Sequence, residues 1–211
     1  MRIRSLKTAL MLMMVLGLAG AVGAQGQAPQ GERGGRQGGG RGRGFFIPPL
    51  MMHTDAYEDG AIVPAKYASG NNGPSVLPGF TITNAPMGTV AYAVIYHDIE
   101  VGLNGPGDVL HMMAWNIPAS ANGWPEGNLP AGSVMGKNLR GQNAYMGPAA
   151  PAGPRYHHYV WELYALNANL DLDPMTATRD DLLKALQGKV VAKAAYVGRY
   201  RSGEAPAPAG R

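Results

Sequence analysis

Four long runs of apolar and aromatic residues limit the folds that this chain can adopt. They cover residues 89–96, 110–117, 156–166 and 190–197. Their length and their content of β-branched and aromatic residues are typical of buried β-strands. The segments between them are rich in Gly, Pro and Asn, which favour turns. Shorter strands are expected near residues 81–84 and 133–137. The sequence therefore predicts a mostly β fold.

One segment, residues 178–187, has the pattern of a helix. Thr178 is a suitable N-cap, the acidic pair two residues later favours the first turn, and Gly188 ends the segment. We expect the buried face of this helix to consist of Leu182, Leu183 and Leu186. Because strands dominate and the helix comes late, residues 45–202 are predicted to form an antiparallel β-sandwich with one or two short helices.

Residues 1–24 have the pattern of a secretory signal peptide. Basic residues occupy the start, and the apolar run of residues 9–18 is too short to span a bilayer of about 30 Å. Small residues precede the expected cleavage site before Gln25. An uncleaved N-terminal anchor is the alternative interpretation. We expect cleavage, and hence a periplasmic or secreted bacterial protein with no transmembrane segment once the signal is removed.

Two terminal segments are predicted to be disordered. Residues 25–44 form a linker rich in Gly and Arg, and residues 203–211 form a short tail, and neither can bury enough apolar surface to fold. The formal net charge of the chain is +4, but the signal and the linker each contribute +3, which leaves −2 for residues 45–211. This balance argues against nucleic acid as a partner of the folded domain.

Asp and His side chains are the candidates for site chemistry, because the chain contains no cysteine for disulfides, Cys-ligated metals or thiol catalysis. Asp98 and His111 flank the loop of residues 102–107, so their side chains can meet at its mouth. His157 and His158 are neighbours in a predicted strand, so only one of them faces a given site. Imidazoles beside Gly- and Pro-rich loops suit a small anion. The alternative is that His111 and His157 are buried strand residues with internal hydrogen bonds.

Three motifs lie around these candidates. Residues 111–118 read HMMAWNIP, and residues 145–153 read YMGPAAPAG and are followed by HHY at residues 157–159. Together with APMGT at residues 85–89, they resemble motifs of the phosphatidylethanolamine-binding protein family, in its bacterial Raf-kinase-inhibitor-like branch. The resemblance covers about residues 53–201.

The resemblance is incomplete in one loop. Where the family has D-P-D-A-P, residues 98–102 read DIEVG, so both prolines are absent and Glu100 stands at the second acidic position. His158 stands where the family has Arg. These differences concern the rim of the expected pocket, so the resemblance does not define the ligand range of this chain.

The resemblance implies a β-sandwich of two antiparallel sheets with a small anion pocket at one end. Its ligand-binding residues would be Asp98, His111, Tyr145, Gly147, Pro148, His157 and Tyr159. Family members bind phosphate, phosphorylated head groups or carboxylates, and no catalytic turnover is associated with the family as a whole. We therefore expect an exported, non-catalytic protein that binds a small anion (phosphate, a phosphoethanolamine-like group or a carboxylate). We expect no cofactor and no metal, and a role in inhibiting or regulating a protein partner.

Two other functions stay open at this stage. The first is a hydrolase that uses Asp98, His111 and His157, with zinc as an option, because two His and one Asp can form a three-ligand catalytic site. The sequence has no H-E-x-x-H motif and no G-x-S-x-G turn to support it. The second is an envelope protein-interaction module with a vestigial pocket, in which the Gly/Arg linker makes salt-sensitive contacts.

Overall fold

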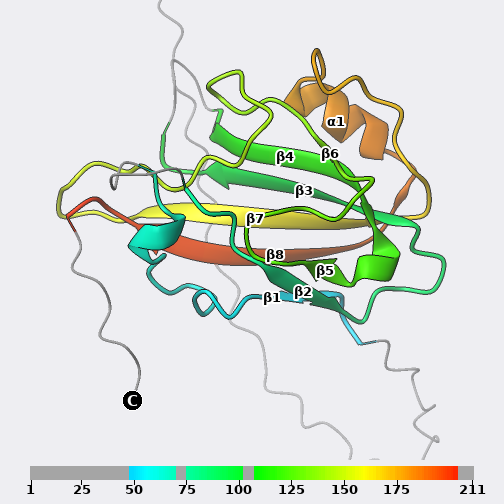
Figure 1. Ribbon diagram of the computed structural model, residues 1–211, viewed down its shortest axis with the longest axis horizontal. Helices are drawn as coiled ribbons and strands as arrows, with labels where there is room; N and C mark the ends of the chain where they lie inside the picture. The colour runs from blue at the N-terminus through cyan, green and yellow to red at the C-terminus, as the bar shows by residue number, and fades with distance from the viewer. Residues whose placement is uncertain (1–47, 70–74, 102–106, 204–211) are drawn as a thin grey trace, which may run out of the picture. The chain divides into compact units, whose positions relative to one another are not determined.

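The computed structural model describes residues 48–69, 75–101 and 107–203 (Figure 1). The predicted signal peptide and linker lie outside these ranges, as does the predicted tail after Gly203. Most of the loop of residues 102–107 is also outside them. Within the described part of the chain, no helix is long and apolar enough to cross a membrane.

The four long apolar runs form four strands of a five-stranded antiparallel sheet with the order β6-β4-β3-β7-β8. The bounds are Ala91–Asp98 for β3, Val109–Pro118 for β4, Val134–Met135 for β6, His157–Leu166 for β7 and Val190–Tyr200 for β8. The prediction of a mostly β fold with antiparallel pairing is confirmed.

A second antiparallel sheet has three short strands in the order β1-β2-β5. These strands are β1 (Met51–His53), β2 (Phe80–Thr83) and β5 (Gly123–Trp124). The sequence indicated β2 but neither β1 nor β5, because two or three residues are too few to show the alternation of a strand. Two 3-10 helices lie in the connections: η1 (Ala65–Tyr67) and η2 (Ala119–Ala121).

Aromatic side chains of the two sheets meet in one core. The ring of Phe80 on β2 lies 5.3 Å from that of Trp124 on β5 and 5.1 Å from that of Trp161 on β7. Trp161 also stacks on Tyr96 of β3, with ring centroids 4.0 Å apart. All four side chains are buried. This core covers the face of the five-stranded sheet on which the candidate site lies.

The opposite face of that sheet packs against α1 (Arg179–Leu186), which lies above β4 and β6 in Figure 1. Thr178 caps the helix and forms a capping box with the acidic residue three positions on. Leu182 and Leu186 are buried. The expectation that Leu183 shares their face was wrong, because Leu183 is 38% exposed. At about 100° per residue, it is turned away from the direction that Leu182 and Leu186 share.

Candidate functional site

Asp98, the last residue of β3, lies where three strands come together. In the register of the sheet it stands opposite Val109 at the start of β4 and Tyr159 on β7. Its side chain is buried. Asp98 Oδ2 lies 2.8 Å from His157 Nδ1, and Oδ1 accepts a hydrogen bond from the backbone N–H of Glu100 at 2.9 Å. The carboxylate is therefore fixed between a strand end and an imidazole.

A pocket of about 210 Å³ opens beside this carboxylate. Its polar lining consists of Asp98, His111, Arg140, His157 and Tyr159, and its apolar lining of Val101, Val109, Leu139, Met146, Ala149, Ala150 and Pro151. The pocket thus brings together four of the seven residues that the resemblance implied. Apolar walls lower the local dielectric constant, which strengthens every polar interaction made inside.

His111, on β4, has a fixed tautomer. Its Nδ1 lies 2.9 Å from the carbonyl oxygen of Met146 and 3.1 Å from that of Gly147. Because carbonyl oxygens only accept hydrogen bonds, Nδ1 carries the proton and donates. Burial lowers the pKa of His111, although the two backbone hydrogen bonds and the nearby Asp98 charge oppose this shift. The neutral ring therefore offers a lone pair at Nε2, and it donates from Nε2 only when protonated.

His157, on β7, is oriented by Asp98. The carboxylate accepts from Nδ1, which leaves Nε2 as the atom that can meet a ligand. In the protonated ring, Nε2–H is a donor whose positive charge is balanced by the buried carboxylate behind it. Among the described residues, the pair Asp98–His157 is thus the part of the pocket best suited to hold an oxyanion.

Tyr159 supports both histidines. Its ring makes an edge contact with His111, with centroids 5.1 Å apart, and its hydroxyl accepts from the backbone N–H of Ala149 at 3.2 Å. Burial and the nearby Asp98 carboxylate raise the pKa of Tyr159 above its usual value. The phenol therefore stays neutral and keeps its proton available for hydrogen bonding.

Tyr145, Gly147 and Pro148 do not line this pocket; they build the wall behind it. The Tyr145 hydroxyl donates to the carbonyl oxygen of Tyr67 at 2.9 Å, and the Pro148 carbonyl accepts from the backbone N–H of Ser69 at 2.8 Å. The Gly147 carbonyl accepts from His111, as described above. A Cβ at Gly147 would overlap the carbonyl oxygen of Tyr67, so only glycine fits at this close approach.

Arg140 is the pocket residue that sequence reasoning missed. It lies in the exposed loop between β6 and β7 and lines the pocket at its rim. Among the described residues, no carboxylate lies within salt-bridge distance of its guanidinium group. A signal existed in the sequence: Arg140 is the last basic residue before the YMGPAAPAG motif. An unpaired guanidinium is a strong partner for an oxyanion.

Glu100 and His158 form a second pair next to the pocket. The backbone N–H and Nδ1 of His158 each lie 2.5 Å from a carboxylate oxygen of Glu100. Asp98, Glu100 and His157 each place a ligand atom within 4.8 Å of the others, and they are the group among the described residues that could hold a metal ion. His111 is not in this group, so the geometry differs from the Asp98–His111–His157 zinc site considered from the sequence.

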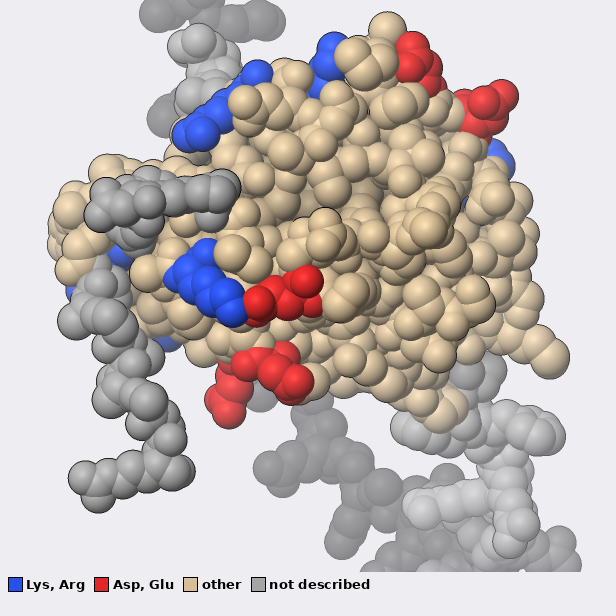
Figure 2. Space-filling view, in the orientation of Figure 1, with Lys and Arg blue, Asp and Glu red and all other residues tan. Residues whose placement is uncertain are grey.

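The charges on the face shown in Figure 2 are few and scattered. Lys and Arg side chains of the described residues stand apart from one another there, and most of the surface is uncharged. This face of the described part of the chain therefore shows no wide basic surface.

Comparison with known proteins identifies the family of this chain. The sequence pattern of the phosphatidylethanolamine-binding protein family matches residues 53–201. This match covers more than half of the chain, which belongs to the phosphatidylethanolamine-binding protein family. The resemblance inferred from the motifs is confirmed.

Relatives with similar sequences carry little functional information in their names. A UPF0098 protein of Methanothermobacter thermautotrophicus is 34% identical over 160 residues, which cover 73% of this chain and 100% of that protein. A Mycobacterium tuberculosis protein named as a lipoprotein, LppC, is 30% identical over 153 residues, which cover 72% of each chain. The second name connects one relative with the cell envelope.

Solved structures show the same fold. The E. coli protein YbcL, described as a member of the mammalian PEBP family, has a TM-score of 0.66 at 22% identity and matches 73% of this chain and 99% of its own. The PEBP homologue CT736 of Chlamydia trachomatis has a TM-score of 0.65 at 24% identity, over 72% and 97% of the two chains. At these identities the two structures support the fold alone.

Proposed function

We propose that this protein is an exported, non-catalytic β-sandwich protein that binds a small anion in the pocket beside Asp98. The ligand carries a phosphate, a phosphorylated head group or a carboxylate. The observation that carries the proposal is the Asp98–His157 pair, which faces an apolar-walled pocket together with the unpaired Arg140. Membership of a family of binding proteins supports it.

The pocket supplies three kinds of contact to an oxyanion. Arg140 provides a permanent positive charge, and protonated His157 donates from Nε2 while Asp98 balances its charge. Neutral His111 accepts from a protonated ligand oxygen through Nε2, and protonated His111 donates. Affinity for phosphate is therefore expected to rise as the pH falls and His111 changes from an acceptor to a donor.

The pocket lining supports a binding role without turnover. Its described residues include no Ser, Thr or Lys side chain to act as a nucleophile, and the Asp98 carboxylate is already held by His157 and by the Glu100 backbone. Leu139 at the rim is 52% exposed and offers apolar surface to a protein partner. We propose further that the protein inhibits or regulates such a partner, as the family resemblance implies.

Export and domain boundaries form part of the same proposal. Residues 1–24 serve as the signal, residues 25–44 as a disordered linker, residues 45–202 as the binding domain and residues 203–211 as a disordered tail. The sequence pattern of the first 24 residues and the lipoprotein name of LppC support a periplasmic or secreted location.

The test is an NMR titration of the protein that begins at Gln25. Phosphate, phosphoethanolamine and acetate are added in turn while the ring signals of His111 and His157 are followed. We expect saturable shifts in both rings, loss of binding in His157→Ala, and retention of binding in His53→Ala, whose side chain is exposed and does not line the pocket. If none of the three anions shifts either ring, the anion-pocket proposal is wrong.

A further inference from the structure

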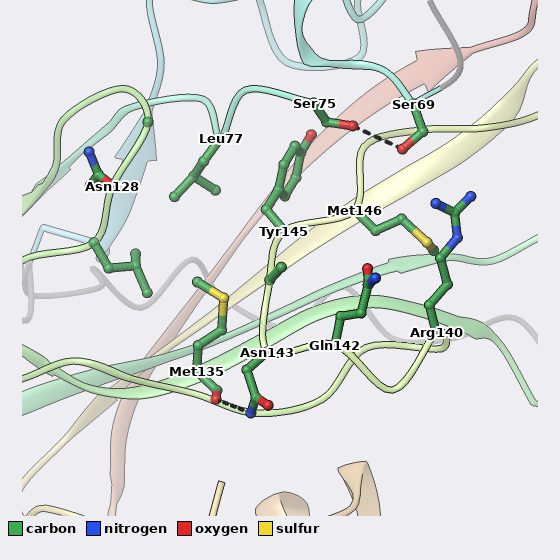
Figure 3. Close-up of a pocket in the computed structure, with 13 residues that line it drawn as sticks. Ser69, Ser75, Leu77, Asn128, Met135, Arg140, Gln142, Asn143, Tyr145 and Met146 are labelled. Carbon is green, nitrogen blue, oxygen red and sulfur yellow. Dashed lines mark hydrogen bonds between the residues drawn. The ribbon is translucent and has the colours of Figure 1, made fainter. Parts of the chain in front are cut away.

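A second, larger cavity adjoins the anion pocket. Its volume is about 530 Å³, and its wall shares Arg140 and Met146 with the smaller pocket. In Figure 3 these two residues lie at one side of the cavity, whereas Asn128 and Leu77 lie at the other, with Tyr145 between them. A ligand group held at Arg140 therefore has open space beside it in the larger cavity, which Asp98 does not line.

The two cavities differ in the size of the group that they can hold. Binding pockets for small molecules usually measure about 300–1,000 Å³. The smaller pocket, at about 210 Å³, falls below this range, whereas the larger cavity, at about 530 Å³, falls within it. The smaller pocket alone holds a compact group, and the remainder of a larger ligand must lie elsewhere.

The lining of the larger cavity is rich in neutral polar groups. It contains the hydroxyls of Ser69 and Ser75 and the amides of Asn128, Gln142 and Asn143, and Arg140 is the one charged residue among the described residues of the lining. Amide and hydroxyl groups both donate and accept hydrogen bonds, as the hydroxyls of a ligand do. An acyl chain lying over these groups would displace their water without replacing its hydrogen bonds, at a cost in free energy.

Several of these groups are available to a ligand. Among the described residues, the side chains of Asn128 and Gln142 make no hydrogen bond, and both residues are exposed. Asn143 uses its Nδ2 to donate to the carbonyls of Met135 and Pro174, at 2.7 and 2.9 Å, which leaves Oδ1 as an acceptor. The amides at this cavity wall can therefore form hydrogen bonds with a ligand that carries several hydroxyls.

The two cavities are also connected through the backbone of Gly147. Its N–H donates to Ser75 Oγ at 3.2 Å on the side of the larger cavity, and its carbonyl accepts from His111 on the side of the anion pocket. Ser75 Oγ in turn lies 2.9 Å from Ser69 Oγ. One series of hydrogen bonds therefore links the walls of the two cavities, which favours recognition of one ligand by both.

We propose that the two cavities together bind a sugar phosphate, with the phosphoryl group between His157 and Arg140 and the sugar hydroxyls against Asn128, Gln142 and the Ser69–Ser75 pair. This inference rests on the proposed function, because it uses the same anion pocket. It adds the class of the ligand: a phosphate ester of a polyol, and not a phosphate on an acyl lipid.

The experiment compares inorganic phosphate with glucose 6-phosphate, glucose 1-phosphate and ribose 5-phosphate by isothermal titration calorimetry, on the protein that begins at Gln25. We expect at least one sugar phosphate to bind about tenfold more tightly than inorganic phosphate, as two net hydrogen bonds to hydroxyls would provide. The double variant Asn128→Ala/Gln142→Ala should lose this advantage and keep its affinity for inorganic phosphate. The control Asn167→Ala/Gln187→Ala removes an exposed Asn and an exposed Gln outside both cavities and should change neither affinity.

The outcomes separate the two proposals. Binding of inorganic phosphate without a gain for any of the three sugar phosphates would overturn the sugar-phosphate inference and leave the anion pocket intact. A gain in affinity for a sugar phosphate that survives in Asn128→Ala/Gln142→Ala would also overturn the sugar-phosphate inference. So would tighter binding of a phosphoserine peptide than of phosphate, if none of the sugar phosphates binds more tightly than phosphate. If neither phosphate nor a sugar phosphate binds, the proposed function itself fails.

Discussion

Two neighbouring residues of β3 take part in two Asp–His pairs on opposite faces of the same sheet. Asp98 pairs with His157 at 2.8 Å, and His97 pairs with Asp108 at 2.6 Å. The first pair faces the anion pocket. The second is covered by α1, whose first residue, Arg179, lies 3.1 Å from the same Asp108 oxygen.

The two pairs differ in what surrounds the second imidazole nitrogen, Nε2, and in the groups that share the carboxylate. The side chain of His97 is 6% exposed, and among the described residues its Nε2 has no hydrogen-bond partner, with Glu162 3.9 Å away. Although burial raises the pKa of Asp108, hydrogen bonds from Arg179 and His97 hold it below its usual value. Arg179 thus adds a positive charge on the carboxylate side of this pair, while His97 Nε2, the counterpart of the ligand-facing His157 Nε2, is buried beside Glu162. We expect an Asp–His pair to bind an anion only where Nε2 of its imidazole opens onto a pocket.

The largest effect on stability is expected from a change in the wall of the pocket beside Asp98. Gly147→Ala places a Cβ against the carbonyl oxygen of Tyr67 and 2.8 Å from Ser75 Oγ, so the backbone that holds His111 must shift. We expect a loss of about 3 kcal/mol in the free energy of unfolding, at the upper end of the effects of overpacking. Urea unfolding measures it, and Gly153→Ala, whose Cβ would meet nothing within 4 Å, is the matched control. Equal stability of the two variants would contradict the close approach at Gly147.

The His97–Asp108 pair should matter for the stability of the fold and not for anion binding. Asp108→Asn leaves Arg179 and His97 without their shared carboxylate. We expect a loss of about 2 kcal/mol in unfolding free energy, less than for a fully buried pair, because the Asp108 side chain is 27% exposed and partly screened by solvent. Asp171→Asn, at an exposed position, should change stability by less than about 0.5 kcal/mol. Phosphate affinity should stay at the wild-type value in both variants.

The Asp98–His157 pair, in contrast, should matter for phosphate affinity. Asp98→Asn keeps the shape of the side chain but removes the charge that balances protonated His157. We expect phosphate to bind about tenfold more weakly, which corresponds to about 1.4 kcal/mol. Calorimetric titration of Asp98→Asn beside Asp108→Asn measures the contrast. Equal affinities for phosphate in these two variants would show that access does not distinguish the two pairs.

The sequence predicted the strands of the large sheet better than it predicted the pocket. Four long apolar runs and a capped helix are local signals, and each formed the expected element. The two-residue strand β5 has no such signal, because its pairing with β2 depends on the packing of Phe80 and Trp124. Leu183 was wrongly predicted to be buried, because helical spacing does not show where the edge of the buried face lies.

The pocket depends on contacts between distant segments, which explains what sequence reasoning missed. Asp98 and His111 were found because strand ends that flank one loop must lie close together. Arg140 was not found, since its approach to the pocket is set by the irregular path of the loop before Tyr145. The resemblance placed Tyr145, Gly147 and Pro148 among the ligand-binding residues. None of them lines the smaller pocket, whereas Tyr145 lines the larger cavity, so their assignment to a ligand stays a prediction.

The smallest effect concerns the pH dependence of stability, and it tests whether His111 is kept neutral by its surroundings. Burial lowers the pKa of His111 in the folded protein, so the unfolded chain binds more protons than the folded one as the pH falls through about 6.5. The folded state is therefore destabilised from that pH downward, until the folded ring is protonated as well. His111→Asn retains a donor for the Met146 and Gly147 carbonyls but does not titrate. Urea unfolding at pH 7.5 and 5.5 should show a loss of stability in the wild type that exceeds the loss in His111→Asn by less than about 1 kcal/mol. A smaller loss in the wild type than in the variant would mean that the folded protein favours charged His111, and Nε2 of His111 would then donate to the ligand instead of accepting from it.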